Sequence, residues 1–262
     1  MLSDYQLICH KFPDNPDLKI YPVGDVHLGA AEHMAHEWQE FCKAVLADEN
    51  AYLVLLGDLL SNGTRSSVSN VFEEIMRPRD QKRLMAEQLR PLKERILGMV
   101  SGNHERRSGK DADNDPSLDI ASKLDIEDLY RRDMAFIKIQ MGNNRSNGSQ
   151  NPTYVLACTH GAAGGRLTGN AVNRAEQFGL GAIEGADALI VGHSHKPFVT
   201  RPGKIVIDPH HNEATIRPLV VVSCTSWLRF GGYAMQKMLL PSTTAPQVIT
   251  LRGNRKEISV EM

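Results

Sequence analysis

Short apolar runs alternate with more polar stretches along most of the chain. Five of these runs end abruptly at a glycine beside an Asp, Asn or His, and they cover residues 18–25, 51–58, 95–103, 153–161 and 186–195. An apolar run of about four to eight residues with such an ending is typical of a buried strand. The pattern therefore predicts five buried strands, each of which presents a polar side chain at its last turn.

The stretches between these runs carry apolar residues at helical spacing, as in Trp38, Phe41 and Val45. They predict helices over residues 34–49, 67–76, 79–96, 118–133 and 170–184, with interruptions at Pro78 and Pro91. Alternating strands and helices are typical of a layered α/β domain, in which functional residues lie at the carboxyl ends of the strands. We therefore expect any active site at the glycine-containing strand ends.

After His195 the pattern changes to strands joined by Pro/Gly turns. Residues 196–208, 217–227 and 247–253 predict antiparallel strands that complete a second sheet. The sequence contains no internal repeat and no convincing linker. We therefore expect a single domain over residues 1–262, with residues 61–91 as a candidate helical excursion over the site.

Composition narrows the class of protein. Of the 262 residues, 41% are hydrophobic and 23% are charged, as in soluble globular proteins. A formal net charge of −1 gives no overall positive field for nucleic acid, although the basic stretch 77–95 could contact a phosphate backbone locally. The composition therefore neither requires nor excludes a nucleic-acid substrate.

Cysteine spacing and hydropathy point to an intracellular compartment. The cysteines form no CxxC pair, which disfavours a zinc ribbon or a disulfide scaffold and favours reduced thiols; they are Cys9, Cys42, Cys158 and Cys224. The N-terminus shows no cationic leader ahead of an apolar run, and no segment approaches the ~18 apolar residues of a membrane span. We therefore expect a cytoplasmic protein with no membrane partner.

The polar residues that close the five runs form a recurring set of Asp, Asn and His side chains. They are Asp25, His27, Asp58, Asn103, His160, His193 and His195. Three oxygen donors and four imidazoles can fill two neighbouring cation sites, and this mixture suits Mn²⁺, Fe or Zn²⁺. Each motif alone is a weak signal. The ordered set at strand ends predicts a dinuclear metal site.

These motifs resemble those of a known superfamily. The series GDVHLG, LLGDLL, SGNHE, THG and GHSH, over residues 25–195, resembles the calcineurin-like metallophosphoesterases. The resemblance implies a four-layer αββα sandwich, in which two mixed β-sheets are flanked by helices. Residues 57–74, with the GNHE that follows, also resemble uncharacterised phosphoesterases of bacteriophages and Firmicutes.

The resemblance also implies roles for individual residues. One divalent ion would be bound by Asp25, His27, Asp58 and His195. The other would be bound by Asp58, Asn103, His160 and His193, so that Asp58 bridges the two ions. A hydroxide between the ions would attack phosphorus, and His104 would be the catalytic acid on the leaving-group side. Mn²⁺ is the first expectation for both ions, with Fe, Zn²⁺ and Ni²⁺ as alternatives.

The second motif departs from that of phosphoprotein phosphatases, which continue it as GDxxDRG. In this chain Ser61 stands in place of the second Asp, and the following Arg is absent. The change argues against a protein phosphatase, and it leaves open which group orients His104. Asn62 and Asp119 are the candidates for that role.

Two arginines after the His160 loop are candidates for binding the substrate. Arg166 and Arg174 could each grip a phosphate, because a guanidinium matches two phosphate oxygens. The function that we expect is hydrolysis of phosphodiesters or phosphomonoesters, and a nuclease or nucleotide phosphodiesterase is favoured over a protein phosphatase. The partner would then be a phosphoester substrate such as a nucleic acid or nucleotide. The alternative is a non-catalytic scaffold or a DNA-binding subunit built on the same fold.

Overall fold

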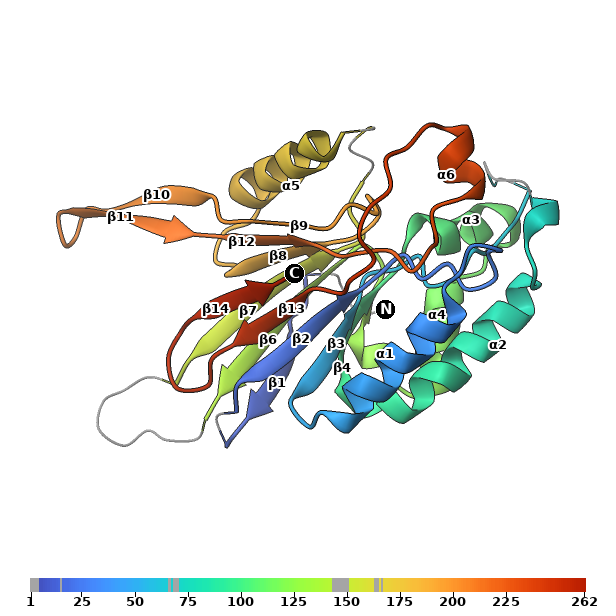
Figure 1. Cartoon of the computed structure of the whole chain (residues 1–262). Coiled ribbons are helices and arrows are strands. Elements are labelled where there is room, and N and C mark those ends of the chain that lie inside the picture. Colours follow the sequence, from blue (N-terminus) through green and yellow to red (C-terminus); the bar gives the residue numbers. More distant parts are fainter. Residues whose placement is uncertain are drawn as a thin grey trace.

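The computed structural model describes residues 5–14, 16–65, 67, 71–142, 151–162, 165 and 167–262. Two large mixed sheets lie face to face, and helices cover the outer side of each sheet (Figure 1). This arrangement confirms the predicted sandwich of two mixed β-sheets flanked by helices.

The first sheet has the strand order β14-β13-β2-β3-β4-β5. Its strands are β2 (Leu18–Val23), β3 (Ala51–Leu55), β4 (Ile96–Val100), β5 (Tyr130–Arg131), β13 (Val248–Leu251) and β14 (Ile258–Glu261). The strands from β2 to β5 run parallel, whereas β13 pairs antiparallel with both β2 and β14. The parallel strands therefore end at one edge of the sheet.

The second sheet has the strand order β1-β6-β7-β8-β12-β9. Its strands are β1 (Ile8–Phe12), β6 (Met134–Met141), β7 (Thr153–Thr159), β8 (Ala188–Val191), β9 (Phe198–Thr200) and β12 (Val220–Ser223). β8 lies between β7 and β12 and is parallel to both. The ends of β7 and β8 therefore also point in one direction.

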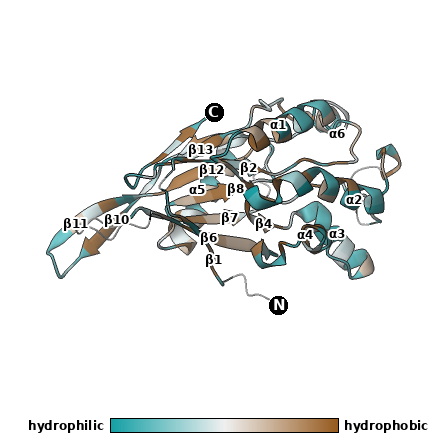
Figure 2. Cartoon of the chain, turned by 90° about the horizontal axis from the view of Figure 1, so that it is seen from below, coloured by the Kyte–Doolittle hydropathy of each residue, from teal (hydrophilic) through white to brown (hydrophobic). Residues whose placement is uncertain are grey.

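Helices form the two outer layers of the sandwich. α1 (Ala35–Ala47), α2 (Pro78–Leu89) and α4 (Pro116–Leu124) pack on the first sheet through buried side chains such as Trp38, Met85 and Ile120. α5 (Thr168–Ala182) packs on the second sheet. A separate apolar cluster fills the space between the sheets, and Figure 2 shows hydrophobic residues concentrated along the strands.

Several shorter helices connect these layers. They are α3 (Asn103–Ala112), α6 (Gly232–Gln236), and the 3₁₀ helices η1 (Val71–Glu73), η2 (Arg90–Arg95) and η3 (Glu127–Leu129). The helix predicted over residues 67–76 is wrong, since η1 is the helical part of its described residues. The helix predicted over residues 118–133 ends at Leu124, where Asp125 adopts a positive φ of 58°. The pattern also missed α3, because its first turn reads as a polar loop.

The candidate excursion over residues 61–91 contains two different kinds of structure. α2 packs firmly into the helical layer through Met85, Ala86 and Leu89. The described residues ahead of it form a loop that includes η1. This loop contacts α3, because Asn62 bonds to His104 and Ser108, and it therefore lies beside the strand-end residues.

The strands after His195 do not all join one sheet, which corrects the sequence prediction. β9 and β12 extend the second sheet, but β13 and β14 extend the first. β10 (Gly203–Asp208) and β11 (Glu213–Pro218) form a separate two-stranded sheet, which we call the ribbon. The ribbon projects away from the sandwich (Figure 1).

All four cysteines are free, and Cys158 and Cys224 are buried. Within the described ranges, no helix is both long enough and apolar enough to cross a membrane.

Candidate metal centre

The five predicted motifs meet where the parallel strands of the two sheets end. The loops after β2, β3 and β4 come from the first sheet, and those after β7 and β8 come from the second. Backbone hydrogen bonds tie these loops together, including Asp25 N–H to the Gly57 carbonyl at 3.1 Å and Gly192 N–H to the His160 carbonyl at 3.1 Å. The parallel topology thus gathers residues from distant parts of the chain.

Most of the candidate ligands adopt an uncommon backbone conformation. The residues with positive φ are Asp25 (53°), His27 (49°), Asp58 (49°), His193 (67°) and His195 (52°). This left-handed region costs roughly 1–2 kcal/mol for a residue with a side chain. The loops hold this strain at the residues with metal-ligand chemistry, and such clustering is typical of functional sites.

Two glycines allow the loops after β3 and β4 to touch. Gly57 has a φ of 81°, and a Cβ at this position would lie 2.2 Å from the Gly102 nitrogen. A Cβ on Gly102 would lie 2.1 Å from Oδ1 of Asp58. No other residue type fits at either position without moving the backbone. The glycines therefore set the distance between Asp58 and Asn103.

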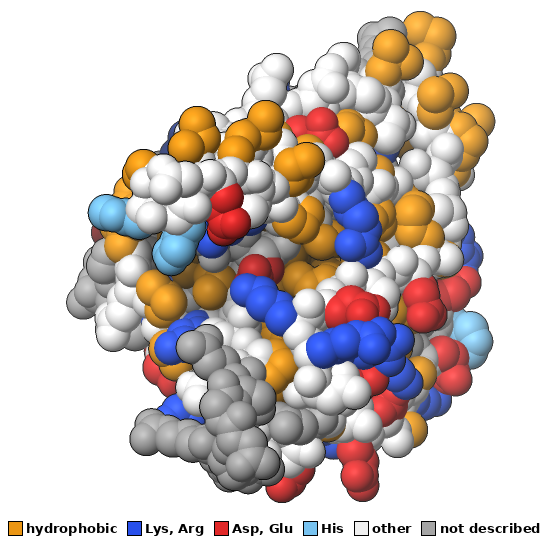
Figure 3. Space-filling model, turned by 90° about the vertical axis from the view of Figure 1, so that its left-hand side faces the viewer, with side chains coloured by type: hydrophobic (Ala, Val, Ile, Leu, Met, Phe, Trp, Pro, Cys, Tyr) orange, Lys and Arg blue, Asp and Glu red, His pale blue; other side chains and the backbone are white. Residues whose placement is uncertain are grey.

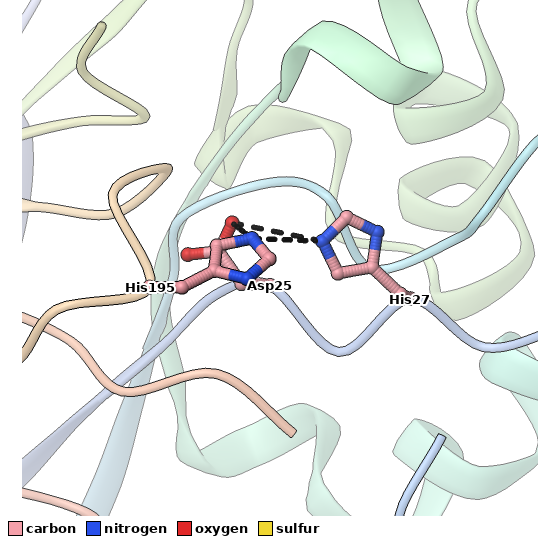
Figure 4. Close-up of side chains that lie close together, drawn as sticks. All are labelled: Asp25, His27 and His195. Carbon is pink, nitrogen blue, oxygen red and sulfur yellow. Dashed lines mark hydrogen bonds and ion pairs between the residues drawn. The ribbon is translucent and has the colours of Figure 1, made fainter. Parts of the chain in front are cut away.

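The first group of candidate ligands contains Asp25, His27 and His195 (Figure 4). His195 Nε2 lies 3.2 Å from Asp25 Oδ1 and 3.2 Å from His27 Nε2. His27 Nε2 lies 3.9 Å from the same Asp25 oxygen. The other oxygen of Asp25 accepts the backbone N–H of His193 at 2.8 Å. One carboxylate oxygen and two ring nitrogens therefore converge on a single point.

The second group contains Asp58, Asn103, His160 and His193. His160 Nε2 lies 2.9 Å from Asn103 Oδ1, 3.0 Å from His193 Nδ1 and 3.4 Å from Asp58 Oδ2. Asn103 begins α3, and His193 follows β8, so the group joins both sheets. An amide oxygen, a carboxylate oxygen and two ring nitrogens meet here.

Asp58 lies between the two groups. Its Oδ1 accepts the backbone N–H of His104 at 2.8 Å, near the start of α3. Its Oδ2 lies 3.4 Å from His160 Nε2 and 4.0 Å from His27 Nε2, which belong to different groups. The side chain is almost fully buried. One oxygen is therefore held by the protein, and the other faces both groups.

Burial and charge oppose each other in the titration of these residues. Burial would raise the pKa of Asp25, but the neighbouring His195 outweighs it and lowers that pKa to about 2. Burial would lower the pKa of His160, but the Asp58 carboxylate outweighs it and raises that pKa to about 9. Burial, and then the nearby His104, hold the pKa of His27 well below its usual value. The site thus combines an ionised Asp25 and a deprotonated His27, which are ligand states, with a protonated His160, whose Nε2 proton a metal ion would displace.

The ligand atoms of the two groups are arranged to bind cations, because their lone pairs face one another. His160 Nδ1 lies 2.8 Å from the Leu56 carbonyl, so a ring that gives up its Nε2 proton to a metal ion keeps the proton on Nδ1 and turns an Nε2 lone pair toward the site. That lone pair faces Asn103 Oδ1 and Asp58 Oδ2, which are acceptors as well. Asp25 Oδ1 is buried without a hydrogen-bond partner. Buried acceptors that face one another need positive charge between them, and the donor types suit divalent transition metals.

His104 is oriented by a main-chain group. Its Nδ1 lies 2.7 Å from the carbonyl oxygen of Ser61, and its Nε2 lies 3.8 Å from Asp58 Oδ2. Burial lowers the pKa of His104, although the Asp58 charge opposes that shift. The ring packs edge-on against His27, with 4.4 Å between the ring centroids. His104 therefore lies against both Asp58 and the first group.

The prediction that Asn62 or Asp119 orients His104 is wrong, because neither side chain contacts the His104 imidazole. Asn62 Nδ2 donates to the backbone carbonyl of His104 at 2.6 Å and to Ser108 Oγ at 3.0 Å, not to the imidazole. Asp119 pairs with Lys82. A main-chain carbonyl is present whatever residue occupies position 61, so the serine does not remove the orienting group.

Sequence reasoning did not single out Glu105, which is fully buried beneath the site. Its carboxylate accepts the backbone N–H groups of Asp58 (2.9 Å), Leu60 (2.9 Å) and Gly102 (3.1 Å). Burial, and then the Asp58 charge, raise the pKa of Glu105 to about 7. A Glu three residues after a helix N-cap is a capping signal, and that signal could have identified it. Glu105 holds the loops after β3 and β4 in register.

One of the two candidate phosphate-binding arginines, Arg174, lies outside these groups. Arg174 is an exposed residue of α5, and Arg166 lies outside the described residues. A third arginine, Arg107, is closer to the chemistry, because its Nη1 lies 3.3 Å from His104 Nδ1. The substrate-binding role of Arg166 and Arg174 stays a prediction.

Comparison with known proteins gives one decisive match. Among solved structures 34 chains match, including the "crystal structure of metallophosphoesterase from Sphaerobacter thermophilus". That alignment has 14% identity and a TM-score of 0.36, and it covers 90% of this chain and 84% of that chain; a likeness this distant carries no argument. No curated protein sequence matches. A family model described as calcineurin-like phosphoesterase matches residues 18–197, which is well over half of the chain. The chain therefore belongs to the calcineurin-like phosphoesterase family.

Proposed function

We propose that this chain hydrolyses phosphodiesters with two divalent metal ions, and that nucleic acids or nucleotides are its substrates. The family uses a dinuclear metal centre and acts on phosphoesters. In the proposal, Asp25, His27, Asp58 and His195 hold one ion, and Asp58, Asn103, His160 and His193 hold the other. The position of Asp58 Oδ2 between the two groups is the observation that supports this assignment most directly.

The chain's own residues have separate tasks in the proposed reaction. Two bound divalent ions, Mn²⁺ in the first instance, would lower the pKa of water and neutralise charge on the phosphoryl oxygens. Asp58 and Glu105 fix the loops that carry the ligands. His104 presents Nε2 toward the site while its Nδ1 is held by Ser61, and we assign it the protonation or stabilisation of the leaving oxygen.

The loop after β3 supports a phosphodiester substrate over a phosphoprotein. Asn62 occupies the position of the arginine in the phosphoprotein phosphatase motif, and its amide is bonded within the protein to His104 and Ser108. It therefore offers no charged group to the three non-bridging oxygens of a phosphomonoester. A diester carries one negative charge less at neutral pH and has less need of such a group.

Hydrolysis of two model substrates tests the proposal. The protein is stripped of metal, reloaded with Mn²⁺, and assayed with bis-p-nitrophenyl phosphate, p-nitrophenyl phosphate and a single-stranded oligonucleotide. We expect the diester to be cleaved with a higher kcat/KM than the monoester, and the oligonucleotide to be cut as well.

The same assay separates the proposal from its alternatives. A preference for the monoester would contradict the assignment of phosphodiesters as substrates. If the fully metallated protein cleaves none of the three compounds, the enzymatic function is wrong and a scaffold or DNA-binding subunit takes its place.

A further inference from the structure

Arg107 lies on the face of α3 that is turned toward the metal site. Asn103, His104 and Arg107 are the first, second and fifth residues of α3, and residues three or four positions apart share one face of a helix. Asn103 Oδ1 lies 2.9 Å from His160 Nε2, and His104 Nε2 lies 3.8 Å from Asp58 Oδ2. The helix therefore presents a candidate metal ligand, the proposed acid and an arginine on the same side.

The guanidinium of Arg107 lies beside the edge of the His104 ring that faces away from Asp58. Its Nη1 lies 3.3 Å from His104 Nδ1 and 3.2 Å from Ser67 Oγ. The two nitrogens of an imidazole lie on either side of Cε1, and it is Nε2 of His104 that approaches Asp58. Because the proposed function places His104 on the leaving-group side, Arg107 lies further along that side.

Arg107 differs from the neighbouring arginine in its contacts. Arg106 donates to two main-chain carbonyl oxygens and pairs with Asp133 at 3.2 Å, so its charge is compensated within the fold. Arg107 makes no ion pair with a carboxylate of the described residues. In the described ranges its hydrogen bonds come from Nη1 alone, and they go to the side chains of Ser67 and His104. Arg107 therefore has a charge that the fold does not pair directly.

The charges nearest to Arg107 belong to the metal site and its surroundings. Burial lowers the pKa of Arg107, and the charges of Asp58, Glu105 and Glu74 oppose that shift. In the proposed function the bound ions compensate the charge of Asp58. A half-buried cation is favourable only beside an anion, so the loaded site would favour an anionic group next to Arg107. A phosphate of the substrate can supply it.

We propose that Arg107 binds the phosphodiester next to the scissile one, on the leaving-group side of a nucleic-acid strand. This inference rests on the proposed function, in which the chain cleaves phosphodiesters and His104 faces the leaving oxygen. A guanidinium matches two phosphate oxygens. Contacts to phosphates hold a strand in position without reading its bases. Arg107 would therefore make the chain prefer bonds whose leaving group is itself part of a strand.

The side of the molecule away from α3 offers no comparable basic surface among its described side chains. α3 lies at the right of Figure 1, and Figure 3 views the molecule from the left. On that side Lys and Arg side chains lie among Asp and Glu side chains (Figure 3). The formal net charge of the chain is −1. A strand would therefore be held by single contacts near the site and not by an overall positive field.

Cleavage of a thymidine trinucleotide with free hydroxyl ends tests the proposal. One of its two phosphodiester bonds has a leaving group that carries the other phosphodiester, and cutting it releases dithymidine monophosphate and a mononucleotide. Cutting the other bond expels thymidine, which has no phosphate, and leaves a dinucleotide with a terminal phosphate. This assignment holds whether the leaving oxygen is the 3′ or the 5′ oxygen. The initial products, separated by liquid chromatography and identified by mass, therefore report which bond is preferred.

The ratio of the two product pairs is expected to depend on Arg107. We expect the Mn²⁺-loaded wild type to release dithymidine monophosphate roughly fivefold or more over thymidine. Arg107→Gln should bring the ratio close to one, and Arg107→Lys, which keeps the charge, should retain part of the preference. Arg83→Gln is the matched control, because Arg83 is an exposed residue of α2 that pairs with Asp80 and Glu87. This variant should keep the wild-type ratio.

The product ratio separates a phosphate contact from an effect through His104. Both bonds belong to the same molecule and compete for the same site, so a general loss of activity lowers both cleavages equally and leaves the ratio unchanged. A wild type that cuts the two bonds equally, or that prefers to expel thymidine, would overturn the proposal. An Arg107→Gln variant with the wild-type ratio would overturn it as well.

A parallel assay with bis-p-nitrophenyl phosphate distinguishes this inference from the proposed function, because that compound has no second phosphate. If the metallated protein cleaves it but cuts the trinucleotide without preference or not at all, the role of Arg107 is wrong and the phosphodiesterase activity stands. If the protein cleaves neither compound, the proposed function is wrong and the role of Arg107 falls with it.

Discussion

The loops at the strand ends and the ribbon depart from the usual distribution of residues in opposite directions. At the strand ends, Asp25 and Asp58 are charged groups with exposed fractions of 0% and 1%. In the ribbon, Ile205 and Ile207 are apolar groups with exposed fractions of 70% and 74%. Soluble proteins normally expose residues of the first kind and bury residues of the second.

The two regions also differ in backbone strain, which is concentrated at the strand ends. Five candidate ligands at the strand ends adopt positive φ, whereas the positive-φ residue of the ribbon, Asn212, lies in its turn. Buried carboxylates and strained loops are stable when a bound charge compensates them. The first region therefore has the strain and the buried charge expected of an ion-binding site, whereas the second is an unstrained strand pair with an exposed apolar face.

The largest effect is expected for Asp58→Asn. The amide keeps an acceptor for the His104 N–H but removes the charge that both candidate metal sites share. We expect kcat/KM for bis-p-nitrophenyl phosphate to fall by about 10³-fold or more, with less metal bound per chain by elemental analysis. Asp119→Asn is the matched control, because this carboxylate pairs with Lys82 outside the site. An Asp58→Asn variant with full metal content and activity would contradict the assignment.

A smaller loss is expected for His104→Gln, with metal content unchanged. General acid catalysis raises a reaction rate by about 10²–10⁴-fold. Cleavage of an oligonucleotide expels a sugar alkoxide, which is a poor leaving group and needs protonation. We expect the loss in kcat to be larger for an oligonucleotide than for bis-p-nitrophenyl phosphate, whose nitrophenolate leaves unaided. Equal losses on both substrates would assign His104 a role other than leaving-group protonation.

Ser61→Ala separates the side chain of this residue from its carbonyl. The carbonyl orients His104, while the hydroxyl donates to Glu74 Oε1 at 2.9 Å. We expect kcat to stay within about threefold of wild type, and the free energy of unfolding to fall by about 1 kcal/mol with the lost hydrogen bond. Steady-state kinetics and urea denaturation measure the two effects. A loss of kcat as large as that of His104→Gln would place the orienting group in the side chain.

His10 is a half-buried titratable group outside the candidate metal site, and its Nε2 lies 2.8 Å from the Leu97 carbonyl. Burial lowers its pKa in the folded state below the ordinary value of 6.5. The unfolded chain therefore binds more protons below that pH, and stability falls as pH decreases through 6.5 until the folded-state pKa is passed. We expect His10→Gln, which keeps a donor for Leu97, to show a shallower decline in urea denaturation between neutral and acidic pH. An unchanged pH dependence would show that His10 does not contribute.

The smallest effect is expected for Ile207→Thr in the ribbon. The side chain is 74% exposed, so the free energy of unfolding of the dilute protein should change by less than about 0.5 kcal/mol. Ile190→Thr is the matched control, because Ile190 is fully buried in β8 and its substitution should cost about 2 kcal/mol or more. Thermal or urea unfolding compares the two variants. Equal losses would mean that the ribbon is part of the folded core.

The strands that carry the site could be predicted because each has a local signature. β2, β3, β4, β7 and β8 all lie within predicted apolar runs, and the family match confirms the resemblance that their motifs showed. The strands after His195 could not be assigned to a sheet in the same way. β12 and β13 have similar apolar sequences, yet they pair in different sheets. Pairing depends on which edge is free in the folded protein, and the local pattern does not contain that information.

The sequence by itself determined the types of ligand and the order in which the strands present them, because hydrophobic periodicity and glycine placement act over a few residues. Only the tertiary structure decided which atoms meet. It placed Ser61 O against His104, buried Glu105 under the loops, and left the isoleucines of the ribbon exposed. These outcomes depend on contacts between residues that are far apart in the chain, including a backbone carbonyl whose role no side-chain pattern can report.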